Sequence, residues 1–406
     1  MLMDTSKIRD DFPILKKELN GKPLIYFDNA CTSLKPRQVI DAITEYYTEY
    51  GACAERSVHT LSTKTTERLE EAREKVAKFI HARKLSEVIW TKNTTEAINL
   101  VAHSFRFERG NKVVTTNLEH SSGLLPWQEL AKRSGINLEF VMCNKEGELT
   151  IESFKEKIDR RTKMVSVIVA SNVAGTRTPI EEITKIAHDN GAVVLADGAQ
   201  SVPHSSTDVK KSDVDFLAFS GHKMCGPTGI GALYGKEHLL KELSPFIIGG
   251  GTIDDATLDS HKLKNLPDRL EGGIQDYAGA FGFGAAVDYL QKIGMENIEK
   301  YEQGLSKELV AGLLKVPNLS LIGPQDWSKR NPLASFNIKG MEPHDIASFL
   351  NNYNIAVRSG THCAYPFHKF IGKDRGSARA SLYFYNMVEE IGVFIDRLNE
   401  MVKILV

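Results

Sequence analysis

The chain has 406 residues, with 51 Lys and Arg against 52 Asp and Glu, and 42% of its residues are hydrophobic. This composition excludes wholesale disorder, and a formal net charge of −1 gives no positive excess for neutralising nucleic-acid phosphates. No apolar run approaches a membrane span, the N-terminus lacks the apolar stretch of a signal peptide, and five scattered cysteines are typical of a reducing compartment. We therefore expect a globular cytoplasmic protein of two domains or one large one.

Short apolar runs alternate with amphipathic helical patterns through the first part of the chain. Strands are predicted at 24–27, 88–91, 112–115, 138–142, 164–170, 192–196, 215–219 and 230–234. Helices are predicted at 8–19, 36–50, 63–80, 95–105, 124–134, 151–158 and 180–190. Strands that alternate with helices, several of them almost entirely apolar, predict an α/β fold with a mostly parallel sheet covered on both faces.

The pattern changes after about residue 255. Helices are predicted at 278–293, 295–314, 344–352 and from 388 to the end. Short strands are predicted at 319–322, 334–338, 356–358 and 380–384. This order of helices and short strands predicts a smaller α+β domain. We therefore divide the chain into an N-terminal helical segment (1–20), a large domain (21–290) and a small C-terminal domain (291–406).

Ligands of an open α/β sheet bind beyond the carboxyl ends of the strands, so the residues that follow each strand are candidates for a site. Thr94 and Thr95 follow one strand and begin a predicted helix, whose free amides favour an anion. His120 and Asn172 follow two other strands. Taken singly, a helix cap, a surface histidine and a turn residue are the commoner explanations.

Two further strand ends carry more specific chemistry. Asp197 follows a buried strand, where a carboxylate is costly unless a metal, an arginine or a protonated ring nitrogen pairs with it. Lys223 follows another strand in the run Ser-Gly-His-Lys, and a partly desolvated lysine at such a position can form a Schiff base. A lysine for an aldehyde, an aspartate for a ring nitrogen, hydroxyls for a phosphate and a histidine to cover a ring together meet the requirements of pyridoxal phosphate.

The chain resembles the class V (fold type I) pyridoxal-phosphate-dependent aminotransferase family, and most closely the group II cysteine desulfurases of the SufS type, from about residue 25 to the C-terminus. The segments that carry the resemblance are 26–30, 94–99, 119–120, 171–173, 196–201, 220–223, 226–229, 358–363 and 379–382. The resemblance implies a large domain with a mainly parallel seven-stranded sheet, a small C-terminal domain and a homodimer.

The resemblance also implies a role for each strand-end residue. Lys223 would form the Schiff base with the cofactor, Asp197 would pair with the pyridine nitrogen, and His120 would stack on the ring. The phenolic oxygen would be addressed by Asn172 and Gln200. The phosphate would be bound at the helix start by Thr94, Thr95, Ser220 and His222.

Cys363 is the predicted sulfur carrier. It lies in a polar loop beside Arg358 and His362, whose positive charges would favour a thiolate. In the resembled family the cysteine at this position attacks the sulfur of substrate L-cysteine, leaving alanine and a persulfide that passes to an acceptor or an iron–sulfur scaffold protein. Lys223 would move protons at the substrate Cα, and His120 is a candidate acid or base. The substrate would be bound by Asn172, Arg379, Arg358 and Arg56.

Several positions depart from the family pattern. Ile274 stands where the family usually has a threonine that reaches the partner subunit's cofactor phosphate, and Ser121 and Glu55 replace histidines. Cys31 and Cys225 fall within family motifs that usually hold other residues, and the sequence assigns neither a role. A structural role is predicted for Cys143, and Cys53 lies in a segment that reaches the active-site entrance in the family.

Other functions stay open at this stage. The same cofactor would serve a selenocysteine lyase, an epimerase or an aminotransferase, with Cys363 incidental. A more distant alternative is a zinc-binding protein that uses His222, Cys225, His362 and Cys363, although these pairs lack the spacing of structural zinc sites. No phosphate-binding Gly-x-x-x-x-Gly-Lys loop and no dinucleotide fingerprint occurs, and we predict no metal.

Overall fold

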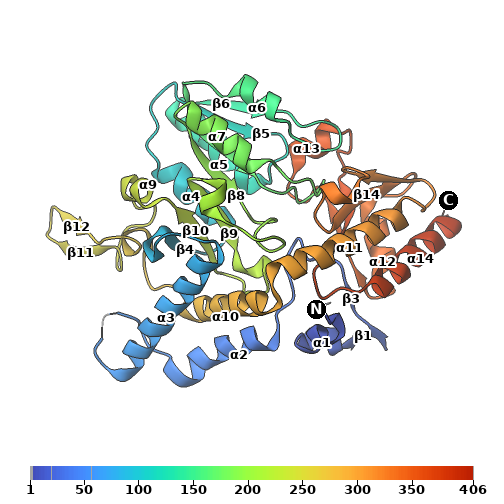
Figure 1. Ribbon diagram of the computed structural model, residues 1–406, viewed down its shortest axis with the longest axis horizontal. Helices are drawn as coiled ribbons and strands as arrows, with labels where there is room; N and C mark the ends of the chain where they lie inside the picture. The colour runs from blue at the N-terminus through green and yellow to red at the C-terminus, as the bar shows by residue number, and fades with distance from the viewer. Residues whose placement is uncertain (1–2, 20, 56, 406) are drawn as a thin grey trace.

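The structure is a computed structural model that describes residues 3–19, 21–55 and 57–405. Within these residues the main sheet has seven strands in the order β4-β10-β9-β8-β7-β5-β6 (Figure 1). Their bounds are Val88–Thr91 (β4), Lys112–Thr116 (β5), Asn137–Val141 (β6), Thr162–Ile168 (β7), Val193–Asp197 (β8), Phe216–Ser220 (β9) and Gly231–Gly235 (β10). Strand β10 is antiparallel to both neighbours and the other pairs are parallel, which confirms the predicted α/β fold.

Helices cover both faces of the main sheet, as its apolar strands require. Alternate strand residues enter two hydrophobic clusters: Val88 and Trp90 belong to one, and Ile89 belongs to the other. The first cluster includes residues of α3 (Thr60–Phe79), α6 (Ile151–Lys157), α7 (Ile180–Asp189) and α10 (Tyr277–Ile293). The second includes residues of α4 (Thr94–Ser104), α5 (Ser121–Ser134) and α9 (Glu237–Glu242). Helix α2 (Arg37–Glu45) runs on into a π-helical turn, and α8 (Val209–Ser212) is a single short turn.

The C-terminal part forms a second layer around a smaller antiparallel sheet. Its strand order is β13-β14-β17-β16, with bounds Leu319–Ile322 (β13), Leu333–Ile338 (β14), Arg358–Gly360 (β16) and Ser377–Ser381 (β17). Its helices are α11 (Met295–Leu313), α12 (Pro343–Asn351), α13 (Tyr365–Phe370) and α14 (Val388–Leu405). A third hydrophobic cluster lies here, which supports a small domain, and the boundaries drawn from the sequence stay a prediction.

The predicted strand at 24–27 pairs outside the main sheet. Strand β3 (Ile25–Tyr26) runs parallel to β15 (Ile355–Ala356), and the side chains of Ile25 and Phe27 pack in the small-domain cluster. The predicted strand at 356–358 is divided between β15 and β16, and the strand predicted at 380–384 ends at Ser381. The early chain therefore crosses to the small domain before it enters the large one.

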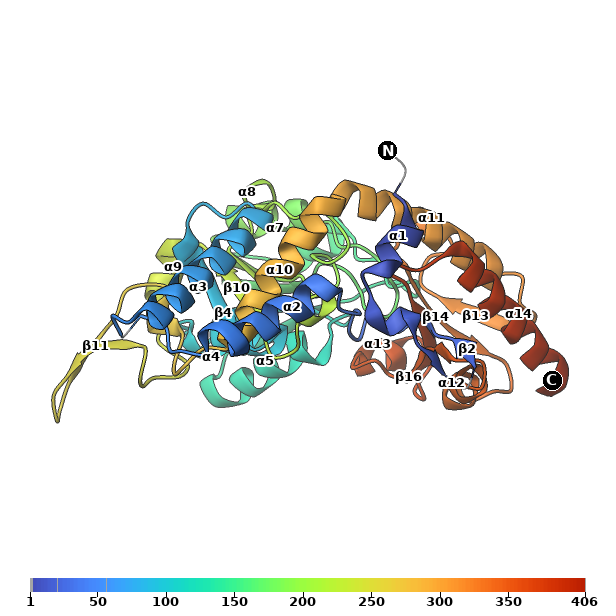
Figure 2. The same ribbon diagram turned by 90° about the horizontal axis from the view of Figure 1, so that it is seen from below.

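The prediction of one helix at 8–19 is wrong. Helix α1 (Thr5–Asp10) ends early, Pro13 starts a 3-10 turn, and β1 (Glu18–Leu19) pairs with β2 (Lys22–Pro23). Proline lacks the amide hydrogen that an α-helix interior needs, so the helical pattern is interrupted there. Phe12 is fully buried against aromatic rings from both domains, and α1 lies beside α14 (Figure 2).

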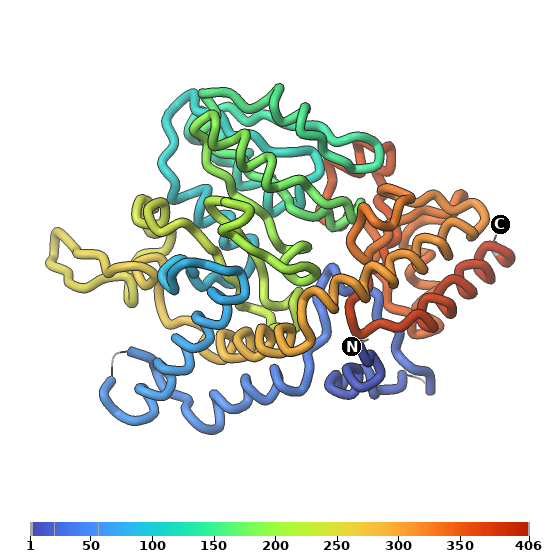
Figure 3. Tube along the Cα trace, in the orientation of Figure 1, coloured from blue at the N-terminus to red at the C-terminus, as the bar shows by residue number. Residues whose placement is uncertain are grey.

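The sequence pattern did not predict a hairpin that projects from the large domain. It consists of β11 (Ile253–Ala256) and β12 (His261–Leu263), and the trace extends away from the rest of the chain there (Figure 3). The hairpin strands are mostly exposed and carry no apolar alternation. Among the described residues, every helix is too short or too polar to span a membrane.

Candidate active site

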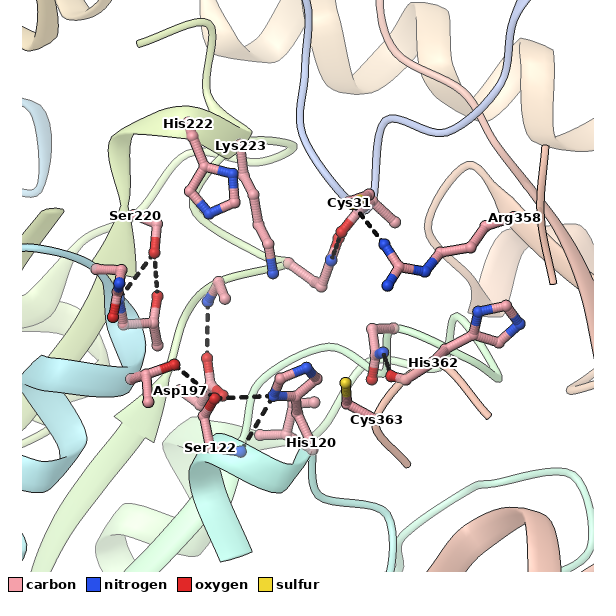
Figure 4. A pocket seen from close by; sticks show the side chains of 18 of the residues that line it. Cys31, His120, Ser122, Asp197, Ser220, His222, Lys223, Arg358, His362 and Cys363 are labelled. Atoms are coloured by element: carbon pink, nitrogen blue, oxygen red, sulfur yellow. Dashed lines mark hydrogen bonds between the residues drawn. The ribbon is translucent and has the colours of Figure 1, made fainter. Parts of the chain in front are cut away.

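A cavity of about 220 Å³ lies at the carboxyl ends of the main-sheet strands, where the small domain meets them (Figure 4). Twelve of the predicted site residues line it: Thr94, Thr95, His120, Asn172, Asp197, Gln200, Ser220, His222, Lys223, Arg358, Cys363 and Arg379. Arg56 lies outside the described residues. The strand ends therefore meet at one site, together with two positions from the small domain's β16 and β17 and one from the loop between them.

Hydroxyl groups gather at the start of α4. Asn93 caps this helix by accepting a hydrogen bond from the Glu96 amide at 3.0 Å. The Thr94 amide donates to Ser220 Oγ at 2.8 Å, and the Thr95 hydroxyl lies 2.7 Å from Ser122 Oγ. A helix N-terminus with hydroxyls on both sides is suited to a phosphate.

Asp197 and Lys223 supply opposite charges inside the cavity. Asp197 ends β8 and is buried, and burial raises the pKa of its carboxyl group although its Oδ1 accepts from the Ala199 amide at 3.0 Å. Lys223 lies in the 3-10 turn after β9, and burial lowers the pKa of its amine while Asp197 opposes that shift. A lysine with a lowered pKa has a larger neutral fraction, which is the nucleophilic form.

His120 caps α5 with its ring. Its Nδ1 accepts from the Ser122 amide at 3.1 Å, which leaves Nε2 as the ring nitrogen able to exchange a proton with a ligand. Burial, with the charges of Lys223 and Arg379, lowers the pKa of His120 to about 3, and burial lowers that of His222 to about 4. Both imidazoles are therefore neutral at neutral pH.

Three buried polar atoms of the cavity lining have no hydrogen-bond partner among the described residues: Asn172 Oδ1, His362 Nδ1 and Arg379 Nε. Their residues are 4%, 5% and 2% exposed, respectively. Arg379 also donates to the Asn172 carbonyl at 3.0 Å and to Asp28 Oδ1 at 3.3 Å. Buried polar groups are seldom left unpaired, so these atoms indicate the place of a polar ligand.

The loop that carries Cys363 is fastened to the large domain. The Cys363 carbonyl accepts from the Ser121 amide at 2.7 Å and from the Ser121 hydroxyl at 2.9 Å. Asn172 Nδ2 donates to the His362 carbonyl at 2.7 Å. His362 and Cys363 have φ values of 50° and 57°, in the left-handed region that side chains seldom adopt. The loop thus holds a partly exposed thiol at the cavity in a backbone conformation that costs energy.

One electrostatic prediction from the sequence is wrong. Burial holds the pKa of His362 well below its usual range, and the charges of Arg379 and His368 act in the same direction, so His362 is not a cation beside Cys363. Arg358 does carry positive charge, and it donates a hydrogen bond to Cys31 Sγ.

Cys31, Ser122 and His362 are cavity residues for which the sequence assigned no ligand role. The only signal for Cys31 was its place inside a family motif.

The four residues of the zinc alternative do not form one group. His222, His362 and Cys363 line the cavity, whereas Cys225 is fully buried and burial raises the pKa of its thiol to about 12. Among the described residues no three His, Cys, Asp or Glu side chains are grouped as metal ligands. The geometry therefore gives the zinc alternative no support.

Comparison with known proteins decides the family. The sequence profile described as aminotransferase class-V matches residues 25–394. The chain belongs to the class-V aminotransferase family. A probable cysteine desulfurase from Synechocystis is 46% identical over 98% of this chain and 95% of its own length. The apo structure of a cysteine desulfurase from Thermococcus onnurineus is 43% identical with a TM-score of 0.95, and it covers 100% of this chain and 99% of its own.

A third relative extends this comparison. The structure of the cysteine desulfurase CsdA (S-sulfonic acid) from Escherichia coli is 32% identical with a TM-score of 0.92, over 100% of both chains. These findings confirm the predicted family, the fold type I architecture and the resemblance to cysteine desulfurases. The subdivision into group II stays a prediction.

The cavity of this family member fits pyridoxal phosphate. Hydroxyls at the start of α4 suit the phosphate, and the buried Asp197 suits a protonated ring nitrogen. The unpaired Oδ1 of Asn172 provides a further polar contact for the cofactor, and the neutral ring of His120 provides a flat surface for the cofactor ring. Lys223 lies in the same cavity with a lowered pKa, as an amine that binds an aldehyde must.

Proposed function

We propose that this chain is a pyridoxal-phosphate-dependent cysteine desulfurase, a sulfurtransferase that converts L-cysteine into L-alanine and leaves a persulfide on Cys363. The observation that carries this proposal is the position of Cys363, whose thiol shares one cavity with Lys223, Asp197 and His120. A transaminase or an epimerase needs the lysine and the aspartate but has no use for a thiol at the cavity. The names of the full-length relatives support the same activity.

The cofactor site consists of strand-end residues. Asp197 would pair with the ring nitrogen, His120 would lie against the ring, and Asn172 with Gln200 would address the phenolic oxygen. The phosphate would be held by Thr94, Thr95, Ser220 and His222. When bound, pyridoxal phosphate acts as an electron sink that stabilises negative charge at the substrate Cα.

Lys223 and His120 move protons in this proposal. The lowered pKa of Lys223 allows its Nζ to take a proton from the substrate Cα and to return one there after sulfur has left. His120 has only Nε2 available, because Nδ1 is engaged by the Ser122 amide. In neutral His120 the ring proton therefore lies on Nε2, from which it can be shared with or passed to the substrate.

Arg379 is the proposed clamp for the substrate carboxylate. Its guanidinium is fixed by the Asn172 carbonyl and by Asp28, and the unpaired Nε remains for a carboxylate oxygen. Arg358 lies directly across the strand pair from Arg379 and adds positive charge. Arg56 is proposed as a third substrate-binding arginine by family resemblance alone.

In this proposal the sulfur is transferred from the enzyme to a second protein. A persulfide on a partly exposed loop cysteine can be attacked by the thiol of an acceptor or of an iron–sulfur scaffold protein. We further propose that the enzyme is a cytoplasmic homodimer with neither nucleic-acid nor membrane partners. In that dimer Ile274, which is 76% exposed, would lie where relatives have a hydroxyl for the partner's cofactor phosphate.

The test is an incubation of the purified holoenzyme with L-cysteine and a reductant, with alanine and sulfide both measured. We expect the two products in equal amounts. Alanine without sulfide, or pyruvate in place of alanine, would contradict a desulfurase. L-selenocysteine is assayed in parallel, and a rate far above that for L-cysteine would favour the selenocysteine lyase alternative.

A further inference from the structure

A second cysteine shares the cavity with Cys363. Cys31 follows β3 in the turn before α2, and its side chain lines the same cavity as Cys363 and Lys223. Figure 4 shows the two cysteine side chains on facing sides of the open space, with Arg358 beside Cys31. Both sulfurs lie close enough to the Lys223 amine to act on its pKa. The two thiols therefore share one electrostatic environment.

The backbone next to Cys31 is held firmly. The Ala30 carbonyl accepts from Gln200 Nε2 at 2.7 Å, and the Ala30 amide donates to Ser381 Oγ at 2.9 Å. The Cys31 amide donates to the Asp28 carbonyl at 3.1 Å. These bonds reach both domains and fix the backbone that carries the thiol.

Arg358 connects the two cysteines. It begins β16, the strand that leads into the Cys363 loop, and its Nη1 donates to Cys31 Sγ. A charge-assisted hydrogen bond of this kind stabilises negative charge on sulfur as the sulfur attacks or leaves. The unpaired Arg379 Nε and Asn172 Oδ1 belong to the same lining, so the cavity that the two cysteines share is suited to a polar ligand.

We propose that Cys31 is a second sulfur carrier, which accepts the sulfane sulfur from Cys363 inside the cavity; this inference rests on the proposed desulfurase activity. The Cys31 thiolate attacks the outer sulfur of the Cys363 persulfide, the Cys363 S–S bond breaks, and a new S–S bond forms on Cys31. Cys363 leaves as a thiolate and takes up one proton, which balances the proton that Cys31 gave up. No oxidant or reductant is consumed.

The position of Arg358 beside Cys31 favours this direction of transfer. A persulfide extends the reach of Cys363 by an S–S bond of about 2.05 Å, and the loop that carries it has no regular secondary structure. Once on Cys31, the charged outer sulfur lies beside the Arg358 guanidinium, and Cys363 is free for a second substrate.

Sulfur mapping in the holoenzyme tests the relay. The enzyme is mixed with L-cysteine without reductant, its thiols and persulfides are blocked by alkylation, and the cysteine peptides are examined by mass spectrometry. We expect sulfane sulfur on both the Cys363 and the Cys31 peptide, and on neither peptide in Cys363→Ser. In Cys31→Ser the initial burst of alanine should fall from about two to about one per subunit.

Cys53→Ser is the matched control, because Cys53 is exposed and lies outside the cavity lining. It should leave the burst unchanged. A persulfide on Cys363 with Cys31 unmodified in the wild-type enzyme would overturn the relay and leave the desulfurase intact. Sulfur on Cys31 in Cys363→Ser, or equal labelling of Cys53, would also overturn it. No alanine and no persulfide at all would overturn the proposed function as well.

Discussion

The two walls of the cavity are built in different ways. The wall that would hold the cofactor consists of strand ends: Asp197 ends β8, and Ser220 and Lys223 follow or end β9 in a sheet buried on both faces. The opposite wall is a loop of the small domain, in which His362 and Cys363 both have left-handed backbone conformations. The first wall is fixed by the core, and the second by a few hydrogen bonds.

This difference matches two chemical tasks. Stabilising charge at a reacting carbon requires groups that do not move, and strand ends in a packed sheet provide them. Passing a sulfur atom to an acceptor requires a thiol that can change its position, and loops with few contacts provide that. Substitution of the central residue of one wall should therefore impair the task of that wall and leave the task of the other intact.

The largest effects are expected from Lys223→Ala and Cys363→Ser. Lys223→Ala should abolish both the yellow colour of the bound cofactor and the activity. Cys363→Ser should keep the colour and lower sulfide release by at least about a thousandfold, because a hydroxyl is a poor substitute for a thiolate nucleophile. Absorption spectra and sulfide assays on the two purified variants measure this. Normal sulfide release by Cys363→Ser would refute the proposed role of that loop.

The difference between the two walls also explains which site residues could be predicted from the sequence. Strand ends of a parallel sheet share one edge, so residues that directly follow apolar runs could be grouped before any contact was known. Asp197 and Lys223 were predicted in this way, and they line one cavity. The loop wall comes from a separate antiparallel sheet, and no periodicity relates Cys363 to the main sheet. Only the family resemblance indicated it.

Two further features of the site depend on tertiary packing and so could not be predicted from the sequence pattern. His362 is neutral because the fold buries it, although its neighbours in sequence are polar. Cys31 reaches the cavity because β3 pairs with β15 in the small domain, a contact between segments more than 300 residues apart. The failed helix at 8–19 has a local cause, since Pro13 was present in the sequence and was given too little weight.

A moderate effect is expected from Ser121→Ala, which weakens the tie between the walls. The Ser121 hydroxyl donates to the Cys363 carbonyl at 2.9 Å, and its loss should slow sulfide release about fivefold, as expected for a hydrogen bond worth ~1 kcal/mol. Ser122→Ala is the matched control, because the Ser122 hydroxyl lies 2.7 Å from Thr95 Oγ1 and 3.0 Å from His120 Nδ1. That variant should weaken cofactor binding instead.

Steady-state kinetics and cofactor titration separate the two serine variants. The comparison of the walls holds if Ser121→Ala changes turnover with unchanged cofactor affinity and Ser122→Ala changes the affinity. Equal effects of both variants on both quantities would mean that the walls behave as one unit.

The last prediction concerns stability and not turnover, and its subject is Glu119, a buried carboxyl group. Its Oε1 accepts from Thr116 Oγ1 at 2.7 Å and from the Ile168 amide at 3.1 Å, while Oε2 has no partner among the described residues. Burial raises the pKa of Glu119 to about 8. The folded protein therefore keeps a proton that the unfolded chain releases above its ordinary pKa of 4.5, so the free energy of unfolding falls as pH rises from there through 8.

Glu119→Gln should remove this dependence, because the amide oxygen can accept the same two hydrogen bonds without a charge. Relative to the wild type, we expect the free energy of unfolding of the variant to gain about 3 kcal/mol between about pH 5.5 and about pH 8.5. Denaturant unfolding of both proteins at each pH measures the gain. Glu308→Gln, at an exposed position of α11, should show none. An equal offset at both pH values would mean that Glu119 is already ionised, and that the cofactor wall contains a second buried negative charge beside Asp197.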